Sequence, residues 1–332
     1  MGDLTMGNRL NPSRRQLLTG AAASLTCAAL PQVAAAKAPM ANTQAPGFYR
    51  FKLGAFEATV VSDGPLQMGE PNGNVFTGVS KEQMTKELGD NFLPTDNVQL
   101  EQNALMINTG ERVVLFDTGV GTAKAFGPNS GRLITGLKAA GLDPKDIDAI
   151  VLTHAHPDHC WGLMADDGSR NFPNAQIYMA QADLDFWTDE GKLAHPQLKD
   201  FIAGTRKQLL PNRERMVFIR DGQEFLPGIQ AMAAPGHTVG HTVYLITSQG
   251  KTLCNAGDIA HHHTMIVEHP RREFSYDTDG KQAVASRLRV FDMLASQRVQ
   301  AVTYHFPWPG LGHIGKRGEA FRYYPVPLRT VL

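Results

Sequence analysis

The residues with the clearest chemical potential lie in one short segment, where three histidines and an aspartate fall within six positions: His154, His156, Asp158 and His159. They follow residues 148–153, an apolar run with the β-branched content of a buried strand, so we expect them at the carboxyl end of that strand. Imidazole nitrogen and carboxylate oxygen suit borderline divalent ions such as zinc. The turn can direct the first two histidines to one ion and the Asp-His pair to a second.

Three further donors stand at the ends of other expected strands: His237, Asp258 and His305. They would complete two sites, one with His154, His156 and His237, the other with Asp158, His159 and His305, and with Asp258 bridging the two. Each ion then keeps an open position for a shared water, which is typical of a catalytic site. Two cations ~3.5–4 Å apart lower the pKa of that water, so a bridging hydroxide is the expected nucleophile.

The elements that must position these side chains come in two rounds of strands followed by helices. Strands are expected at residues 48–53, 56–62, 103–108, 112–116, 148–153, 176–179, 217–220, 229–233, 242–247, 252–255 and 299–304. Helices are expected at residues 80–88, 132–140, 182–188, 197–210 and 281–297. The repeated order indicates two sheets packed face to face with helices outside.

Two stretches outside those elements invite further expectations. Residues 65–103 form a long polar connection rich in Gly, Pro and Asn, of a kind that covers a site or a partner surface, so a homodimer is possible. Asp117 follows an expected strand and precedes Gly119. On its own it is equally a site acid or a turn-forming residue.

Charge and cysteine content exclude several classes of protein. The chain has 32 basic and 32 acidic residues among 332, and no basic stripe, which argues against a nucleic-acid partner or a nucleic-acid phosphodiesterase. Three cysteines are too few for a disulfide framework. Cys160 and Cys254 are expected to be buried free thiols, with a single disulfide between them as the alternative.

The first residues have the pattern of an export signal. Arg14 and Arg15 precede a short apolar run at residues 19–30, and the small residues 34–36 suit cleavage. The arginine pair is of the twin-arginine type, which carries folded proteins. Residues 1–36 are therefore interpreted as a leader, and the mature protein as periplasmic or secreted.

The same leader argues against a stable membrane anchor, because its apolar run is shorter than the ~20 residues of a spanning helix. Cys27 leaves a lipoprotein open as an alternative, although residues 24–26 match a lipidation site poorly. Residues 37–332 are expected to form a single domain.

The motif order His-x-His-x-Asp-His, then Gly-His, Gly-Asp and a final His resembles the metallo-β-lactamase superfamily. Within it, residues 45–54, 126–133, 183–187 and 307–314 resemble the group of methyl parathion hydrolase and its lactonase and esterase relatives, over about residues 45–329. The resemblance implies an α+β fold, an αβ/βα four-layer sandwich of two mixed sheets with helices outside. The metals would lie at the edge between the sheets.

The resemblance also implies roles for single residues. Asp117 becomes an acid that orients metal-binding histidines, and His241 a supporting residue rather than a ligand. Phe126 and Trp187 fall where the group lines its apolar substrate pocket, and by composition alone either is equally a plain core residue. His261 and Tyr276 stand where the phosphotriester hydrolase has aliphatic residues, so a polar rim is expected, with His261 at the pocket mouth. A plain surface loop at residues 261–263 is the alternative.

The function that these expectations favour is hydrolysis by two divalent ions, most simply Zn²⁺. Asp258 and Asp117 would be the catalytic acids, and the substrate a small lactone or carboxylic ester of the dihydrocoumarin, acyl-lactone or aryl-ester type. The alternative enzyme is an organophosphate phosphotriesterase, which would use the same ions. A non-catalytic binding protein on this fold would be expected to lack ligands, and none of the seven is missing.

Overall fold

The computed structural model describes residues 38–45, 47–73, 75–123 and 126–332. Pro46–Leu332 form one compact unit; of the other unit, Met1–Ala45, the described residues 38–45 contain no helix or strand. The expected leader, with Arg14, Arg15 and Cys27, lies outside the described residues.

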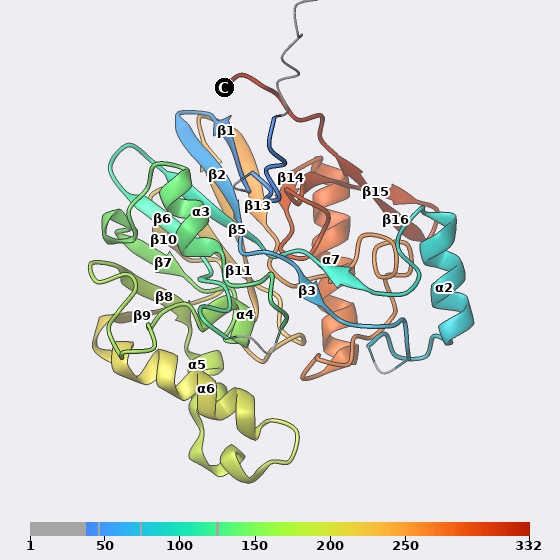
Figure 1. Cartoon of the computed structure of the whole chain (residues 1–332), viewed down its shortest axis with the longest axis horizontal. Coiled ribbons are helices and arrows are strands. Elements are labelled where there is room, and N and C mark those ends of the chain that lie inside the picture. Colours follow the sequence, from blue (N-terminus) through green and yellow to red (C-terminus); the bar gives the residue numbers. More distant parts are fainter. Residues whose placement is uncertain (1–37, 46, 74, 124–125) are drawn as a thin grey trace, which may run out of the picture. The chain divides into compact units, whose positions relative to one another are not determined.

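Two seven-stranded sheets dominate the larger unit (Figure 1). The first has the order β1-β2-β5-β6-β7-β8-β9, with β1 to β6 antiparallel and β6 to β9 parallel. Its strands are β1 (Phe48–Leu53), β2 (Phe56–Ser62), β5 (Asn103–Asn108), β6 (Val113–Phe116), β7 (Ala149–Val151), β8 (Gln176–Ala180) and β9 (Met216–Ile219).

The second sheet runs in sequence order, and only β13 and β14 are parallel within it. Its strands are β10 (Glu224–Leu226), β11 (Ile229–Ala233), β12 (Thr242–Ser248), β13 (Lys251–Asn255), β14 (Gln300–Val302), β15 (Leu311–Arg317) and β16 (Ala320–Pro325). Both large sheets are therefore mixed, as expected.

Helices cover the outer face of each sheet. They are α2 (Lys81–Asp90), α3 (Leu133–Ala139), α5 (Gln181–Thr188), α6 (Lys199–Leu209) and α7 (Gly280–Gln297), with 3₁₀ turns η1 (Pro144–Asp146), η2 (Glu190–Ala194) and η3 (Leu210–Arg215). The short helix α4 (Pro157–Cys160) follows β7 and carries Asp158 and His159. In Figure 1, α3, α5 and α6 lie on the side of β6 to β9, and α7 and α2 on the side of β15 and β16.

Alternating side chains along the strands build this layered core. In β2, Val60 belongs to the apolar cluster between the sheets and Val61 to the cluster under α3, α5 and α6. In β12, Tyr244 faces the inner cluster and Val243 the cluster under α7. Successive strand residues point to opposite faces, so both faces of each sheet are buried. The predicted four-layer sandwich is confirmed.

Local signals in the sequence placed most elements within a few residues. Ser80 caps α2 by accepting a hydrogen bond from the Gln83 backbone N–H, so the helix expected at residues 80–88 begins one residue later, at Lys81. The strand expected at residues 148–153 is shorter, because β7 ends at Val151. The Cys160 and Cys254 thiols are buried and free, and burial raises the pKa of both.

β15 and β16, the hairpin that closes the second sheet, were not predicted from the sequence. Gly312 and Gly315 interrupt the apolar pattern of β15 and lower its strand propensity. In the structure, a Cβ on Gly312 would lie 2.2 Å from the Tyr323 ring, and one on Gly315 would lie 2.8 Å from the Tyr324 ring. The glycines are thus explained by cross-strand aromatic packing, which local pattern does not reveal.

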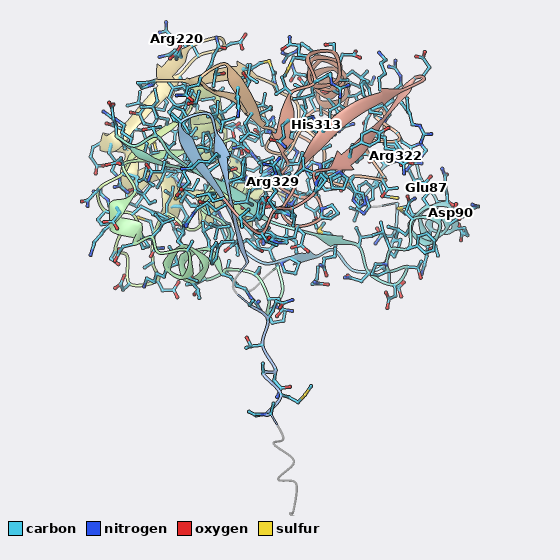
Figure 2. The ribbon with its side chains drawn as sticks, turned by 90° about the horizontal axis from the view of Figure 1, so that it is seen from above. Glu87, Asp90, Arg220, His313, Arg322 and Arg329 are labelled. Carbon is cyan, nitrogen blue, oxygen red and sulfur yellow. The ribbon has the colours of Figure 1, made fainter. Side chains whose placement is uncertain are left out.

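The connection at residues 65–103 carries a short two-stranded sheet, β3 (Leu66–Gln67) with β4 (Gln99–Leu100), as well as α2. Figure 2 shows Glu87 and Asp90 of α2 on the same side of the view as Arg322 of β16. In the described part of the chain no helix combines the length and apolar character needed to cross a bilayer.

Candidate metal centre and its cavity

Strand ends and the short helix α4, which carries Asp158 and His159, bring the seven predicted ligands together. Asp258 and His305 follow β13 and β14, which are parallel neighbours, so their carboxyl ends meet at one edge of the second sheet. His154 and His156 follow β7 of the first sheet, and His237 follows β11. All seven side chains are buried. The two sheets thus contribute to one site, although its members lie as far apart in the sequence as His154 and His305.

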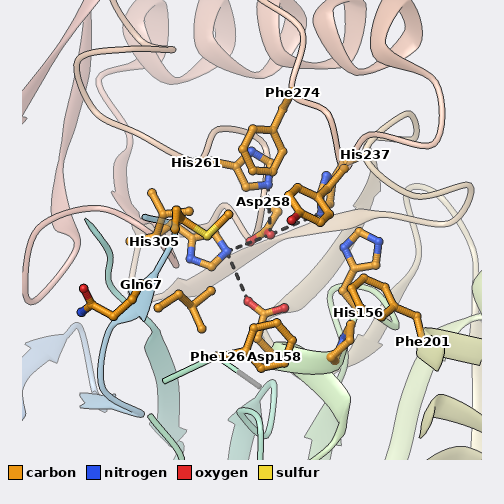
Figure 3. A pocket seen from close by; sticks show the side chains of 15 residues that line it. Gln67, Phe126, His156, Asp158, Phe201, His237, Asp258, His261, Phe274 and His305 are labelled. Atoms are coloured by element: carbon orange, nitrogen blue, oxygen red, sulfur yellow. Dashed lines mark hydrogen bonds and ion pairs between the residues drawn. The ribbon is translucent and has the colours of Figure 1, made fainter. Parts of the chain in front are cut away.

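Asp258 is the centre of this arrangement (Figure 3). Its Oδ2 lies 3.0 Å from His305 Nε2 and 3.3 Å from Nε2 of both His159 and His237. Two compact donor groups meet around it. The first is His154, His156 and His237; the second is Asp158, His159, Asp258 and His305. The sequence analysis expected the same two triads with Asp258 bridging them; in the structure Asp258 groups with the second set, and His237 also forms a third group with His261 and Asp277.

The donor groups fit divalent metal ions. His159 Nε2 and Asp258 Oδ1 are buried without a hydrogen-bond partner among the described residues, and such orphaned polar atoms are costly. Nε2 of His154 and Nε2 of His237 face each other at 3.2 Å. A cation among these atoms would satisfy them all, and a set of imidazoles and carboxylates suits zinc. Two ions could be held, with Asp258 near both.

Outer partners turn the imidazoles towards the centre. His159 Nδ1 lies 2.9 Å from Asp117 Oδ2, His237 Nδ1 lies 2.9 Å from Asp277 Oδ1, and His305 Nδ1 lies 2.8 Å from the Glu101 carbonyl oxygen. Each Nδ1–H donates outward, which leaves the Nε2 lone pair for an ion. Sequence reasoning missed Asp277, since it lies 40 positions from His237 in a turn with no pattern of its own.

Asp117 and His241 touch the donor groups but belong to neither. Asp117 has a left-handed backbone, with φ of 61°, and its carboxylate accepts hydrogen bonds at 2.8 Å from both the backbone N–H and the hydroxyl of Thr153. His241 Nδ1 donates to the Ala234 carbonyl, so its Nε2 accepts the Asp258 backbone N–H at 3.0 Å. Both residues therefore fix the backbone or the ring of a donor.

Burial and mutual charge interactions shift the pKa values of the donor residues. Burial disfavours ionisation of Asp258, but the charges of His159 and His305 outweigh it and hold the pKa of this carboxyl well below its usual range. Burial and the neighbouring imidazoles lower the pKa of His154 and His156 well below the usual histidine value. For His159, His237 and His305, burial is outweighed by Asp258 and neighbouring carboxylates, which raise the pKa of these imidazoles. Metal binds the ionised carboxylate and the neutral imidazole, so a cation would have to displace protons from these three histidines.

A cavity of about 330 Å³ opens directly above the donors. Donor residues and His261 form its floor, and Figure 3 shows their side chains converging on Asp258. Its apolar walls are Leu66, Met68, Leu100, Phe126, Phe201, Phe274 and Tyr276. Phe126 and Tyr276 line it as predicted, and the connection at residues 65–103 covers it. Phe201 and Phe274 were not singled out, because isolated aromatic residues carry no sequence signal of a pocket.

The positions of two predicted pocket residues differ from expectation. Trp187 is 2% exposed and packs edge-on against the His156 ring, with centroids 4.8 Å apart; it supports that ligand from behind and does not line the cavity. His261 is not at the mouth, since it is 2% exposed and its Nε2 lies 3.3 Å from Asp258 Oδ2. Its ring stacks on the Phe274 ring with centroids 3.7 Å apart, and this packing places His261 on the floor of the cavity.

The alternative of a plain surface loop at residues 261–263 is also wrong. His262 is buried, and its Nδ1 accepts the backbone N–H groups of Thr264 and Met265. Neither ring nitrogen of His261 has a hydrogen-bond partner among the described residues. His261 therefore presents unused hydrogen-bonding capacity at the floor of the cavity.

Comparison with known families decides the assignment. The model of the family described as "Metallo-beta-lactamase superfamily" matches residues 98–297, more than half of the chain. The chain belongs to the metallo-β-lactamase superfamily. With this donor set, it is a metal-dependent hydrolase of that superfamily, and its two donor groups support two divalent ions, of which zinc fits best.

Known members of the superfamily resemble the chain to different extents. AidC, a dizinc quorum-quenching lactonase solved with its product, is 31% identical with a TM-score of 0.80, covering 86% of this chain and 99% of AidC. The hydrolase AbOPH is 29% identical with a TM-score of 0.80, covering 86% of this chain and 100% of AbOPH. An N-acyl homoserine lactonase of Bacillus cereus is 27% identical over 45% of this chain. The chain spans 59% of that curated relative's length.

Proposed function

We propose that the chain is a dinuclear hydrolase of lactones or carboxylic esters. The observation that carries this proposal is the cavity, whose floor is formed by side chains of both donor groups and whose walls are apolar. A compact carbonyl group attached to an apolar remainder matches such a space. When bound, two zinc ions would supply an activated water as nucleophile and would polarise the carbonyl.

The chain's own residues would bind and orient the substrate. Asp258, within reach of both donor groups, would hold the two sites next to each other. Asp117 and Asp277 would keep the proton on Nδ1 of their histidines, so that Nε2 stays available. The aromatic walls would exclude water and pack against the apolar part of the substrate. The likeness to lactonases such as AidC supports a cyclic ester as one substrate.

A phosphotriester is the second candidate substrate. The aromatic walls formed by Phe126, Phe201 and Phe274 would also accommodate the aryl arm of such a molecule. His261 favours the carbonyl compounds, since its unpaired ring nitrogens can hydrogen-bond a lactone or ester oxygen but desolvate poorly against apolar arms.

One assay series tests both candidates. The purified protein is stripped of metal with a chelator, reloaded with zinc and assayed for kcat/KM on dihydrocoumarin, an acyl-homoserine lactone, an aryl acetate and an aryl dialkyl phosphate. We expect activity only after reloading, at about two ions per chain, and the highest values for the carbonyl substrates. A faster phosphotriester reaction would establish the second candidate, and no turnover of any substrate by the loaded protein would sink both.

We also propose that residues 1–36 direct export by the twin-arginine route, because Arg14 and Arg15 stand before a short apolar run. Changing both arginines to lysine should leave full-length precursor in the cytoplasm. The measurement is the ratio of precursor to mature protein in cytoplasmic and periplasmic fractions. An unchanged periplasmic yield would contradict the twin-arginine assignment.

A further inference from the structure

One buried carboxylate joins two loops of the metal centre while belonging to neither donor group. Asp183 lies in the first turn of α5 and is fully buried. Its Oδ2 accepts the backbone N–H of Ala155 at 2.7 Å, and its Oδ1 accepts the backbone N–H of Gly240 at 2.6 Å. Short bonds to an ionised acceptor are among the stronger hydrogen bonds of proteins.

The two loops that Asp183 joins carry the first donor group and come from different sheets. Ala155 stands between His154 and His156, after β7 of the first sheet. Gly240 stands three residues after His237, in the loop between β11 and β12 of the second sheet. The Asp183 side chain therefore bridges the loop of two ligands and the loop of the third, next to a backbone hydrogen bond at 3.0 Å from the Thr242 N–H to the Thr153 carbonyl that joins the same two segments. The second group takes Asp158 and His159 from α4, in the segment that follows His156, but it takes Asp258 and His305 from the ends of the adjacent strands β13 and β14, which the two hydrogen bonds of Asp183 do not reach.

The contact requires both the carboxylate and the glycine. Both partners of Asp183 are N–H donors, so the side chain must accept twice, and an asparagine would turn an NH₂ group towards one of them. A Cβ on Gly240 would lie 2.8 Å from the Asp183 backbone nitrogen and 3.0 Å from its Cβ. Burial raises the pKa of Asp183 to about 6, so the acid is retained at an electrostatic cost.

We propose that Asp183 is a positioning residue that sets the metal affinity of the first donor group, His154, His156 and His237. It holds the two ligand loops at the separation that one ion requires. The inference rests on the proposed function in one respect, namely that these histidines bind an ion. It goes beyond that function because it makes the two sites depend on different parts of the fold.

The test compares Asp183→Asn with Asp185→Asn in the full chain. Asp185 lies on the same helix two residues further on and is exposed, so it is the matched control. Stepwise zinc affinities are measured by competition with a chromophoric chelator, and Co²⁺ loading gives a visible spectrum for each site. Reference variants His156→Ala and Asp158→Ala identify which step and which band belong to which group.

We expect Asp183→Asn to weaken binding of the ion of the first group by ~10–100-fold, the usual effect of losing an outer partner, and to leave the other ion unchanged. Its Co²⁺ spectrum should lose the band that His156→Ala loses. Equal weakening of both ions would make Asp183 a general structural residue, and affinities equal to those of Asp185→Asn would show no positioning role. Either result overturns the inference.

Gly240→Ala approaches the same contact from the other loop and serves if Asp183→Asn does not fold. Its added methyl group must displace α5 or the loop, so the same ion should be weakened selectively. Unselective or absent weakening in this variant also overturns the inference. Failure of the proposed function is a separate result, because wild type would then not bind two ions at all.

Discussion

The floor and the walls of the cavity are held in different ways. On the floor, imidazoles are fixed by directional hydrogen bonds to partners such as Asp117, Asp277 and the Glu101 carbonyl. On the walls, Phe126 and Phe201 come from separate segments and are held by packing. A directional network fails when one member is altered, whereas apolar packing accommodates substitution at smaller cost. The floor should therefore govern whether reaction occurs, and the walls which substrate reacts.

The largest expected effect comes from the centre of the floor. Asp258→Ala removes a carboxylate that lies beside histidines of both donor groups, so we expect loss of at least one ion and a fall in kcat/KM of roughly 10³-fold or more, about 4 kcal/mol of transition-state stabilisation. Metal content by elemental analysis and kcat/KM on a lactone are the measurements.

The matched control for that variant is Asp292→Ala, an exposed acid of α7 paired with Lys316. It should retain both ions and full activity, because exposed ion pairs contribute little. Near-normal turnover by Asp258→Ala would mean that another residue bridges the two groups, and the contrast between floor and walls would fail at its strongest point.

A smaller loss of activity is expected from Asp117, which contacts the ligand His159 and belongs to neither donor group. Asp117→Asn keeps the size of the side chain but weakens its hold on His159 Nδ1, so activity should fall by ~10–100-fold while metal content falls only in part. The measurement is kcat/KM together with zinc per chain. Loss of both ions outright would make Asp117 a ligand, and unchanged activity would show that His159 needs no outer acid.

The same contrast explains what the sequence could predict. Ligands such as His154 and Asp258 stand at strand ends in short motifs, so their chemistry could be inferred and the structure brings them together. Asp183 and Asp277 act across distances that no local pattern encodes. Their sequence neighbourhoods look like an ordinary helix start and an ordinary turn, and only the tertiary fold reveals their partners.

The cavity walls and the strands also show that local sequence patterns can be predicted from the sequence, whereas tertiary contacts cannot. Phe274 and Phe201 become wall residues through tertiary packing. The sequence shows that they are aromatic but not where in the fold they lie. Trp187 was misplaced for the same reason, since an aromatic residue behind His156 and one beside the substrate have similar sequence surroundings. Strands with regular apolar patterns were predicted. β15 was missed because Gly312 and Gly315 interrupt its apolar pattern.

His261 lies where the floor and the walls of the cavity meet, beside Asp258 and against Phe274. A substitution there tests whether the walls alone select the substrate. His261→Leu removes the unpaired ring nitrogens and adds apolar surface above Asp258. We expect the ratio of kcat/KM for a phosphotriester to that for a lactone to rise by roughly 10- to 200-fold, about 1–3 kcal/mol. Both rate constants are measured on the same zinc-loaded preparation.

His263→Leu is the control, because His263 packs against Phe306 and Tyr323 away from the cavity. It should leave the ratio unchanged. If His261→Leu instead loses zinc along with activity on both substrates, His261 belongs with the directional floor, and the substrate preference must arise elsewhere.

The smallest effect is expected at the rim, where Tyr276 is 46% exposed and its ring packs against Phe274 with centroids 5.4 Å apart. Tyr276→Phe keeps that ring packing and removes only a hydroxyl that water already solvates. A hydrogen bond from this hydroxyl to a substrate would replace one to water, a net gain of about 1 kcal/mol at most, so kcat/KM for a lactone should change by no more than about fivefold. Tyr324→Phe, equally exposed but on β16, gives the baseline for loss of a surface hydroxyl. A larger fall confined to Tyr276→Phe would show that its hydroxyl is desolvated in the complex. Tyr276 would then act through a directional hydrogen bond, as the floor residues do. The part of the cavity held by directional bonds would then include the rim.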